Sequence, residues 1–204
     1  MKICIIGCGP GSPEYLTPVA RKAAMDADYL IGSKRLLELI PYAKGERMVN
    51  AGHAAKVIEQ IEEKSSKGKV AVLVSGDPGV SSLARPLIDK VGAEHCRVIA
   101  GISSVQVAFA AIGQPWQEAR IISAHGANPE DDGPLAERYA VLLGRPEAIK
   151  WAAAFAQRLD GEWEAWVCQN LTMENEKIVK VDPAALAKME APSLALVLLV
   201  RKGR

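Results

Sequence analysis

Short apolar runs recur along the first half of the chain, and they constrain its fold more than any other feature. The runs lie at residues 3–6, 29–31, 70–74 and 97–99. Runs of this length that are apolar on both faces are typical of strands in a parallel sheet covered by helices. Thr17 and Pro18 then provide a helix N-cap and a first helical position, and further helices are predicted over residues 33–39 and 54–64. The first half is therefore predicted to be an α/β domain with a parallel sheet.

The same alternation begins again after the turn at residues 113–116. Apolar runs then lie at residues 121–123, 140–143, 165–168, 178–179 and 194–200. The third and fourth of these runs are separated by too few residues for a crossover helix, so they are predicted to be antiparallel neighbours. The sequence thus predicts two α/β domains, residues 1–113 and 114–204, with a parallel sheet in the first and a mixed sheet in the second.

Composition limits the partners of the chain. Its 204 residues include 25 Lys and Arg and 24 Asp and Glu, which leaves a formal net charge of +1 and no global field toward nucleic acid or anionic membranes. No apolar run approaches the roughly 20 residues of a membrane span. The four cysteines form no C-x-x-C pair, which favours reduced thiols. We expect a cytoplasmic protein with neither a nucleic-acid nor a membrane partner.

Four predicted strand ends carry Gly, Pro, Ser and other turn-forming residues in place of the charged residues of ordinary surface loops. These loops lie at residues 7–13, 76–79, 101–104 and 123–126. In open α/β sheets, ligands bind beyond the carboxyl ends of the strands, where loops expose backbone N–H groups. The sequence therefore predicts a ligand site that is built largely from turns.

The first loop departs from the dinucleotide-binding fingerprint that it superficially follows. Ser12 stands in the place of the third glycine, and Pro10 and Pro13 remove two N–H donors. Asp26 and Asp28 lie at the spacing of an acidic ribose ligand, or are solvated helix ends. A nicotinamide site is thus disfavoured, and a tight turn without any ligand remains an alternative.

The other three loops each allow a structural and a functional interpretation. Gly76–Gly79 suits a type II turn, and with a ligand present Asp77 would accept hydrogen bonds from its hydroxyl or amine groups. One of Ser103 and Ser104 is expected to cap the following helix, and the hydroxyl of the other then remains available for a ligand. His125 is either a structural or surface histidine or a group for proton transfer or carboxylate binding.

No group of residues has the spacing of a metal site or of a known nucleophile motif. His53, His95 and His125 are not grouped with one another or with the cysteines. Neither a G-x-S-x-G elbow nor a Walker A sequence is present. We therefore expect no protein-bound metal, and no side chain is assigned a catalytic role.

Five segments, taken in chain order, resemble the tetrapyrrole methylase family. They are GCGPGSPEYLTPVA, GSKRLLEL, GDPGV, GISSVQVAFAAIGQPW and SAHG. Within the family, the combination of GSKRLLEL, GISSVQ, the tryptophan after the G-x-P turn and S-x-HG is similar to the cobalt-precorrin-7 C5-methyltransferase branch. The resemblance is strongest over residues 1–126, and Gln169 replaces a common acidic residue later in the chain.

The resemblance implies two α/β domains, a homodimer, and S-adenosylmethionine as the cofactor in the cleft between the domains. Cofactor contacts carried over from the matching motifs fall on Pro10, Asp77, Val80, Ser103, Ser104, Leu142 and Leu143. The implied reaction is methylation at C5 of a precorrin, with or without cobalt, in cobalamin biosynthesis. Because the chain ends at Arg204, without the second domain of some relatives, a separate protein is expected to methylate C15 and remove a carboxylate.

The chemistry that follows from this resemblance is methyl transfer by positioning. A sulfonium is a strong methyl donor and the reduced ring has enamine-like carbon, so alignment of the two should dominate and no covalent nucleophile is needed. The ring carries many carboxylates, which predicts a cationic rim. Its candidates, each of which is otherwise a solvated surface charge, are Lys34, Arg35, Arg85, Arg120 and His125.

Three alternatives stay open. One is another methyltransferase of the same family, acting on uroporphyrinogen, diphthine or ribosomal RNA, although the net charge of +1 disfavours RNA. A second is a nicotinamide-dependent oxidoreductase, which the broken glycine fingerprint disfavours. A third is a corrinoid carrier without catalytic activity.

Overall fold

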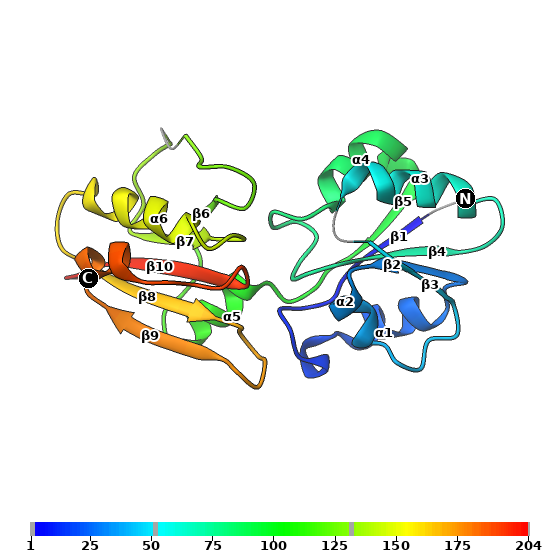
Figure 1. The fold of residues 1–204 in the computed structure, drawn as a ribbon, viewed down its shortest axis with the longest axis horizontal. Coiled ribbons are helices and arrows are strands. Elements are labelled where there is room, and N and C mark those ends of the chain that lie inside the picture. The colour runs from blue at the N-terminus through cyan, green and yellow to red at the C-terminus, as the bar shows by residue number, and fades with distance from the viewer. Residues whose placement is uncertain (1–2, 51–52, 131–132, 204) are drawn as a thin grey trace. The chain divides into compact units, whose positions relative to one another are not determined.

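The computed structural model describes residues 3–50, 53–130 and 133–203 of the chain. The chain forms two compact units, Met1–Ser104 and Val105–Arg204 (Figure 1). The sequence prediction set a boundary between residues 113 and 114, whereas the contacts divide the chain at the start of helix α5 (Ser104–Ala111). This helix therefore belongs with the second sheet. Among the described residues, no helix is long and apolar enough to cross a membrane.

The first unit contains a five-stranded parallel sheet. Its strands are β1 (Ile3–Gly7), β2 (Tyr29–Gly32), β3 (Glu46–Val49), β4 (Val70–Val74) and β5 (Cys96–Ile99). Their order in the sheet is β3-β2-β4-β1-β5, and every pair is parallel, which confirms the predicted sheet. β4 is buried at every position because it lies at the centre between β1 and β2. β3 was not predicted, since it is a mostly exposed edge strand with two charged residues.

Helices cover both faces of this sheet (Figure 1). They are α1 (Pro18–Met25), α2 (Lys34–Glu38), α3 (Ala54–Lys64) and α4 (Ala84–Val91), with short 3-10 helices η1 (Pro13–Tyr15) and η2 (Ala93–His95). One core contains buried residues of α1 and α2 with Ile6, and the other contains those of α3 and α4 with Ile5. Thr17 caps α1 as predicted, because its Oγ1 accepts a hydrogen bond from Ala20 N at 3.2 Å.

The second unit contains a mixed five-stranded sheet, as predicted. Its strands are β6 (Arg120–Ser123), β7 (Arg138–Leu142), β8 (Trp163–Gln169), β9 (Lys177–Val181) and β10 (Ala195–Arg201). Their order is β6-β7-β10-β8-β9; β6 and β7 are parallel and the other pairs are antiparallel. The antiparallel pairing of β8 with β9 confirms the prediction from their short connection.

An aromatic cluster fills the core on one face of the second sheet. Helix α6 (Ala148–Gln157) and the 3-10 helix η3 (Pro183–Lys188) cover this face, and α5 lies on the other (Figure 1). The Tyr139 ring meets Phe155 edge-on at a centroid distance of 5.0 Å and lies 5.6 Å from Trp163. Its hydroxyl accepts a hydrogen bond from Ala136 N at 2.9 Å, so the buried polar atom has a partner.

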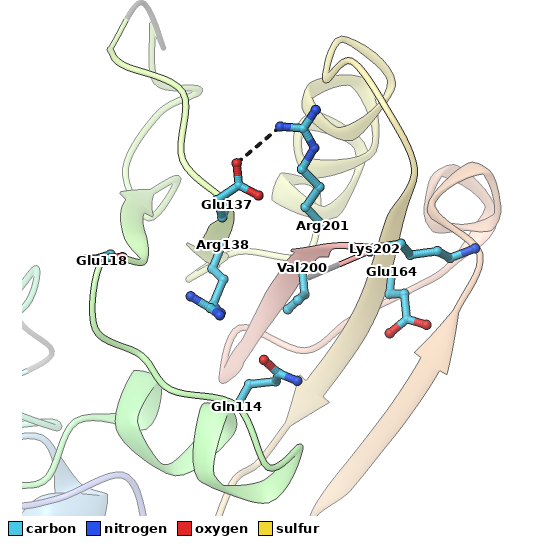
Figure 2. A pocket seen from close by; sticks show the side chains of 9 residues that line it. Gln114, Glu118, Glu137, Arg138, Glu164, Val200, Arg201 and Lys202 are labelled. Atoms are coloured by element: carbon cyan, nitrogen blue, oxygen red, sulfur yellow. Dashed lines mark hydrogen bonds and ion pairs between the residues drawn. The ribbon is translucent and has the colours of Figure 1, made fainter.

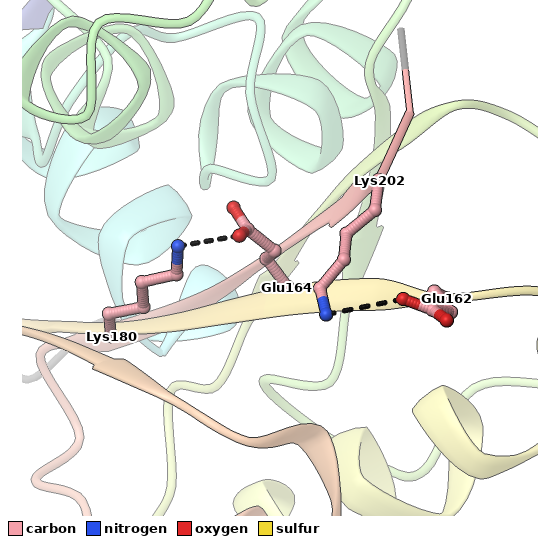
Figure 3. A network of polar contacts seen from close by, with 4 residues as sticks. All are labelled: Glu162, Glu164, Lys180 and Lys202. Carbon is pink, nitrogen blue, oxygen red and sulfur yellow. Dashed lines mark hydrogen bonds and ion pairs between the residues drawn. The ribbon is translucent and has the colours of Figure 1, made fainter.

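Two Lys–Glu ion pairs lie on or next to strands β8, β9 and β10 of the same sheet (Figure 3). Lys180 Nζ lies 2.5 Å from Glu164 Oε1, and Lys202 Nζ lies 3.4 Å from Glu162 Oε2. Exposed pairs of this kind are each worth about 0 to 1 kcal/mol because solvent screens them. The stability of the unit therefore depends on the apolar core and not on these pairs.

Two Leu→Ala substitutions test this division between core and surface. Leu198 in β10 is 0% exposed, so Leu198→Ala should lower the free energy of unfolding of the second unit by about 2 to 5 kcal/mol. Leu135 is 80% exposed, and Leu135→Ala should change it by about 0.5 kcal/mol or less. The chain's four tryptophans all lie in the second unit, so urea unfolding followed by tryptophan fluorescence measures both. Equal losses for the two variants would contradict the assignment of the core.

Candidate functional site

Three of the four turn-rich loops follow neighbouring strands of the first sheet. β4, β1 and β5 are adjacent and parallel, so their carboxyl ends meet at one edge. The first two loops pair directly there: Gly9 N donates to Gly76 O at 3.3 Å and Gly76 N to Gly9 O at 2.8 Å. Cys8 N also donates to Val74 O at 2.9 Å. The first and second loops therefore form one continuous stretch of paired backbone.

Glycine is required where these loops meet the third loop. A Cβ on Gly101 would lie 2.2 Å from Gly76 O, and a Cβ on Gly7 would lie 2.6 Å from Gly101 N. Real Cβ atoms do not approach backbone so closely, and neither clash involves the end of a flexible side chain. Gly76 is needed for a different reason, since its φ of +65° favours a residue without a Cβ.

Asp77 joins the second loop to the third. Its Oδ1 accepts a hydrogen bond from Gly79 N at 2.8 Å, and its Oδ2 accepts one from Gly101 N at 3.0 Å. Each carboxylate oxygen has further acceptor capacity, so a ligand donor can still be bound. The side chain thus holds two loops in register, a role that the sequence analysis did not predict.

The predicted type II turn at Gly76–Gly79 was wrong. The turn closes with a hydrogen bond from Val80 N to Asp77 O at 3.1 Å, but Gly79 lacks the positive φ that a type II turn needs at this position. The bond from Gly79 N to the Asp77 side chain supplies the physical reason, because an aspartate can fix a turn through its own carboxylate.

Five predicted cofactor residues lie in these three joined loops. Pro10 is buried in the first loop, and Asp77 and Val80 are half-buried in the second. Ser103 is 4% exposed in the third, and Ser104 begins α5. The structure therefore brings these five residues to one edge of the first sheet, although the contacts themselves stay predictions.

Arg35, one of the five predicted rim cations, lies at the same edge. It belongs to α2, which follows β2, and its Nη2 donates to Ser75 Oγ at 3.1 Å just beyond the end of β4. Its Nη1 is buried and has no hydrogen-bond partner among the described residues. Burial lowers the pKa of the guanidinium, and the nearby Cys8 opposes that shift.

Cys8 lies inside the first loop as a neutral thiol. The residue is 0% exposed, and its Sγ donates a weak hydrogen bond to Ile6 O at 3.6 Å. Burial raises its pKa to about 12, against the opposing effects of Arg35 and of a hydrogen bond with the backbone of Val74. A thiol in this state is neither a nucleophile nor a counter-ion at neutral pH.

Lys34 and Arg85, also predicted rim cations, are solvated. Lys34 is exposed on α2 beside Arg35. The Arg85 side chain on α4 is 91% exposed, and its Nε lies 3.9 Å from Asp89 Oδ2 within the same helix. Among the described residues of the first unit, Arg35 is the one predicted cation with a hydrogen bond to the segment that follows a strand, at Ser75 after β4.

The fourth loop belongs to the second unit and adjoins the end of β7. Ala124 N donates to Leu142 O at 2.9 Å, so the loop that carries His125 lies beside Leu142, a predicted cofactor contact. His125 is exposed and packs against Gly144, where a Cβ would lie 2.0 Å from His125 Nδ1. Leu143 is 0% exposed in the core, and its N donates to Ala195 O at 3.0 Å.

The remaining predicted cation, Arg120, is at the other end of β6 from His125. Its Nη1 donates to Pro134 O at 3.1 Å, and its guanidinium lies against Gly133. Arg145 is a residue that sequence reasoning missed, since its Nε donates to Ala124 O at 3.1 Å and ties the β6 and β7 loops together. The sequence does contain a signal for it, because Arg145 lies between a glycine and a proline in the turn that follows β7.

A separate cavity of about 480 Å³ lies in the second unit (Figure 2). It is lined by Gln114, Glu118, Glu137, Arg138, Glu164, Val200, Arg201, Lys202 and Gly203. Arg138 begins β7, so this cavity lies at the edge of the sheet opposite to His125 and Leu142. Arg138 Nε is buried without a hydrogen-bond partner among the described residues, while Arg201 Nη1 pairs with Glu137 Oε1 at 3.2 Å.

The sequence matches one family of known proteins. The family profile of the Tetrapyrrole (Corrin/Porphyrin) Methylases matches residues 2–187. The chain is 35% identical over 184 residues to a probable cobalt-precorrin-7 C(5)-methyltransferase of Methanocaldococcus jannaschii, across 86% of this chain and 87% of that protein. It is 30% identical over 178 residues to the cobalt-precorrin-7 C(5)-methyltransferase of Salmonella typhimurium, across 86% of this chain and 88% of that protein.

Solved structures share the fold. The uroporphyrin-III C-methyl transferase of Thermus thermophilus, complexed with S-adenyl homocysteine, has a TM-score of 0.79 at 18% identity, covering 98% of this chain and 97% of that one. The precorrin-6Y methylase of Archaeoglobus fulgidus has a TM-score of 0.71 at 23% identity, covering 100% of this chain and 99% of that one. At these identities the likeness shows the fold alone.

A matched pair of Asp→Asn substitutions tests the role of Asp77. In Asp77→Asn, the amide nitrogen cannot accept the second backbone N–H, which should cost about 1 to 3 kcal/mol. Hydrogen–deuterium exchange at residues 76–80 and 101–104 should accelerate. Asp89→Asn, which removes only an exposed pair with Arg85, should leave exchange in both loops unchanged. Unchanged exchange in Asp77→Asn would refute the tie between the loops.

Cysteine alkylation tests the state of the Cys8 thiol. At pH 8, a thiol with a pKa of about 12 is ionised in only about one molecule in 10,000. Iodoacetamide should therefore modify the half-buried Cys4 and Cys96 before the buried Cys8 and Cys168, as measured by mass spectrometry of peptides. In urea all four should react at similar rates. Early modification of Cys8 in the native protein would contradict its burial.

Proposed function

Because the chain belongs to the tetrapyrrole (corrin/porphyrin) methylase family, we propose that it is an S-adenosylmethionine-dependent methyltransferase that acts at C5 of a cobalt-precorrin or precorrin in cobalamin biosynthesis. One observation carries this proposal: the 35% identity to a probable cobalt-precorrin-7 C(5)-methyltransferase across 86% of the chain. The alignments also span 87% and 88% of the two relatives named for this reaction.

The joined loops of the first unit fit an S-adenosylmethionine site. They lie at the carboxyl edge of the sheet, where ligands of α/β proteins bind, and their glycines let the three loops pack closely together there. Asp77 can accept a hydrogen bond from the cofactor while it holds the loops, and Pro10, Val80, Ser103 and Ser104 lie in the same loops. In the second unit, Leu142 and Leu143 are the proposed contacts.

The chemistry that this chain must provide is alignment. S-adenosylmethionine supplies an electrophilic methyl group, so the protein needs to orient the ring carbon toward it and exclude water. Holding two reacting atoms about 3 to 3.5 Å apart can recover roughly 7 to 11 kcal/mol of the barrier. Backbone loops fixed by glycine contacts and by Asp77 suit this task. The neutral Cys8 thiol is no candidate for a covalent nucleophile.

The structure disfavours a nicotinamide site, because neither candidate acidic residue is placed to bind a ribose. Asp28 Oδ2 accepts a hydrogen bond from Lys69 N at 2.7 Å, directly before β4, so its carboxylate closes a connection at the amino edge of the sheet. A dinucleotide ribose would lie at the carboxyl edge. Asp26 is the C-cap residue of α1. Neither aspartate is therefore placed to bind a ribose.

The proposal includes features of the family that extend beyond a single chain. We propose a homodimer, and a separate protein that methylates C15 and removes a carboxylate. The names of the two aligned relatives refer only to C5 and support this division. We also propose a cytoplasmic location, in keeping with the four free thiols among the described residues. The cationic rim is proposed as Arg35 with the exposed Lys34, Arg85 and His125, and with the half-buried Arg120.

Turnover with labelled cofactor tests the function. Incubation with S-adenosylmethionine carrying a ¹³C-methyl group and cobalt-precorrin-7 should add one labelled methyl, which NMR should locate at C5. Uroporphyrinogen III should stay unmodified under the same conditions. Isothermal titration should detect binding of S-adenosylhomocysteine and none of NADH. Labelling of uroporphyrinogen III alone, or binding of NADH alone, would overturn the proposal.

A further inference from the structure

Arg35 is a partly buried cation whose charge has no counter-ion among the described residues. Its one hydrogen bond there runs from Nη2 to the neutral hydroxyl of Ser75, and Nη1 is buried without a partner. No carboxylate contributes to the electrostatics of the guanidinium, although Glu38 lies on the same helix. Burying a charge without a partner lowers stability, because the lost hydration is not replaced.

Cys8, the ionisable side chain that interacts with Arg35, cannot neutralise its charge. Cys8 interacts electrostatically with the guanidinium, but burial raises its pKa to about 12. The thiol is therefore uncharged at neutral pH, and Ser75 has no charge to offer. Among the described side chains of the first unit, none supplies a compensating negative charge to Arg35.

The place of Arg35 in the sheet separates it from the proposed methionine end of the cofactor. Arg35 follows β2 and its guanidinium contacts Ser75 after β4, whereas Ser103 and Ser104 follow β5, and the order β2-β4-β1-β5 puts two strand spacings between β4 and β5. At about 4.8 Å per spacing, this is roughly 10 Å along the edge. The cofactor's carboxylate is therefore expected near the serines and not near Arg35.

We infer that Arg35 binds a side-chain carboxylate of the tetrapyrrole and thereby determines specificity for the acidic form of the ring, an inference that rests on the proposed function. The contact between Arg35 and Ser75 is exposed, so an anion can approach from the Nη2 edge. The bond to Ser75 and the covered Nη1 fix the plane of the guanidinium before the ligand arrives. A planar guanidinium donates to a carboxylate through paired N–H groups, which gives direction as well as charge.

The test compares Arg35→Gln and Arg35→Lys with Arg97→Gln, which removes an exposed arginine of β5. Cobyrinic acid, a corrin with free side-chain carboxylates, and its methyl ester serve as ring probes, with S-adenosylhomocysteine as the cofactor probe. Arg35→Gln should weaken binding of cobyrinic acid about 10- to 100-fold, as expected for a charge-assisted hydrogen bond. Binding of the ester and of S-adenosylhomocysteine should change less than about twofold. The affinity of Arg35→Lys for cobyrinic acid should lie between those of Arg35→Gln and the unmodified protein. The affinity of Arg97→Gln should equal that of the unmodified protein.

Thermal unfolding of the ligand-free protein separates this role from a structural one. Because Arg35→Gln removes an uncompensated charge, its Tm should stay the same or rise. A lower Tm with unchanged affinity for cobyrinic acid would overturn the inference. So would equal losses for the acid and the ester, or a loss confined to S-adenosylhomocysteine, which would assign Arg35 to the cofactor's carboxylate. If the unmodified protein bound S-adenosylhomocysteine but no corrin, the proposed function itself would fail together with this inference.

Discussion

Two hydrogen bonds accepted by the Asp77 carboxylate hold together the part of the molecule on which the candidate site depends. They come from Gly79 N at 2.8 Å and Gly101 N at 3.0 Å, and so connect the loop after β4 with the loop after β5. Because β1 lies between these strands, the same tie confines the first loop, whose Gly7 touches Gly101. Glycine permits the backbones to approach, and the carboxylate keeps them there.

Much of this architecture could be predicted because the apolar pattern and the burial have the same cause. β4 is a continuous apolar run and is buried on both faces, and the family profile confirms the resemblance found in the loop motifs. β3 escaped prediction because a solvated edge strand needs no apolar run, and Glu46–Val49 has none. The predicted boundary at residue 113 followed a Gly-Pro turn, whereas the contacts divide the chain where α5 begins.

The candidate site shows where sequence reasoning stops. Parallel strands force their following loops to one edge, so the gathering of the turn-rich loops was predictable. The type II turn was wrong because Pro-Gly propensity describes an isolated turn, and Asp77 overrides it with its own acceptor. Arg120 and His125 were both predicted as cations that bind ring carboxylates, yet they lie at opposite ends of β6. The direction of the predicted strand could have shown that they do not lie at the same edge of the sheet. The contact between Arg35 and Ser75 joins residues 40 apart in the chain, so no local pattern could indicate it.

A buried guanidinium nitrogen without a hydrogen-bond partner among the described residues distinguishes Arg35 from the other proposed rim cations. A solvated lysine such as Lys34 keeps its hydration, and its pairing with an anion is worth only about 0 to 1 kcal/mol. A guanidinium that folding has already desolvated meets an incoming carboxylate at a lower effective dielectric, where the attraction is stronger. The free energy of desolvating the guanidinium is then part of the free energy of folding, and it does not reduce the affinity for the ligand. Ser75 directly follows the fully buried strand β4. The burial of β4 stabilises the first unit and can offset the unfavourable desolvation of Arg35.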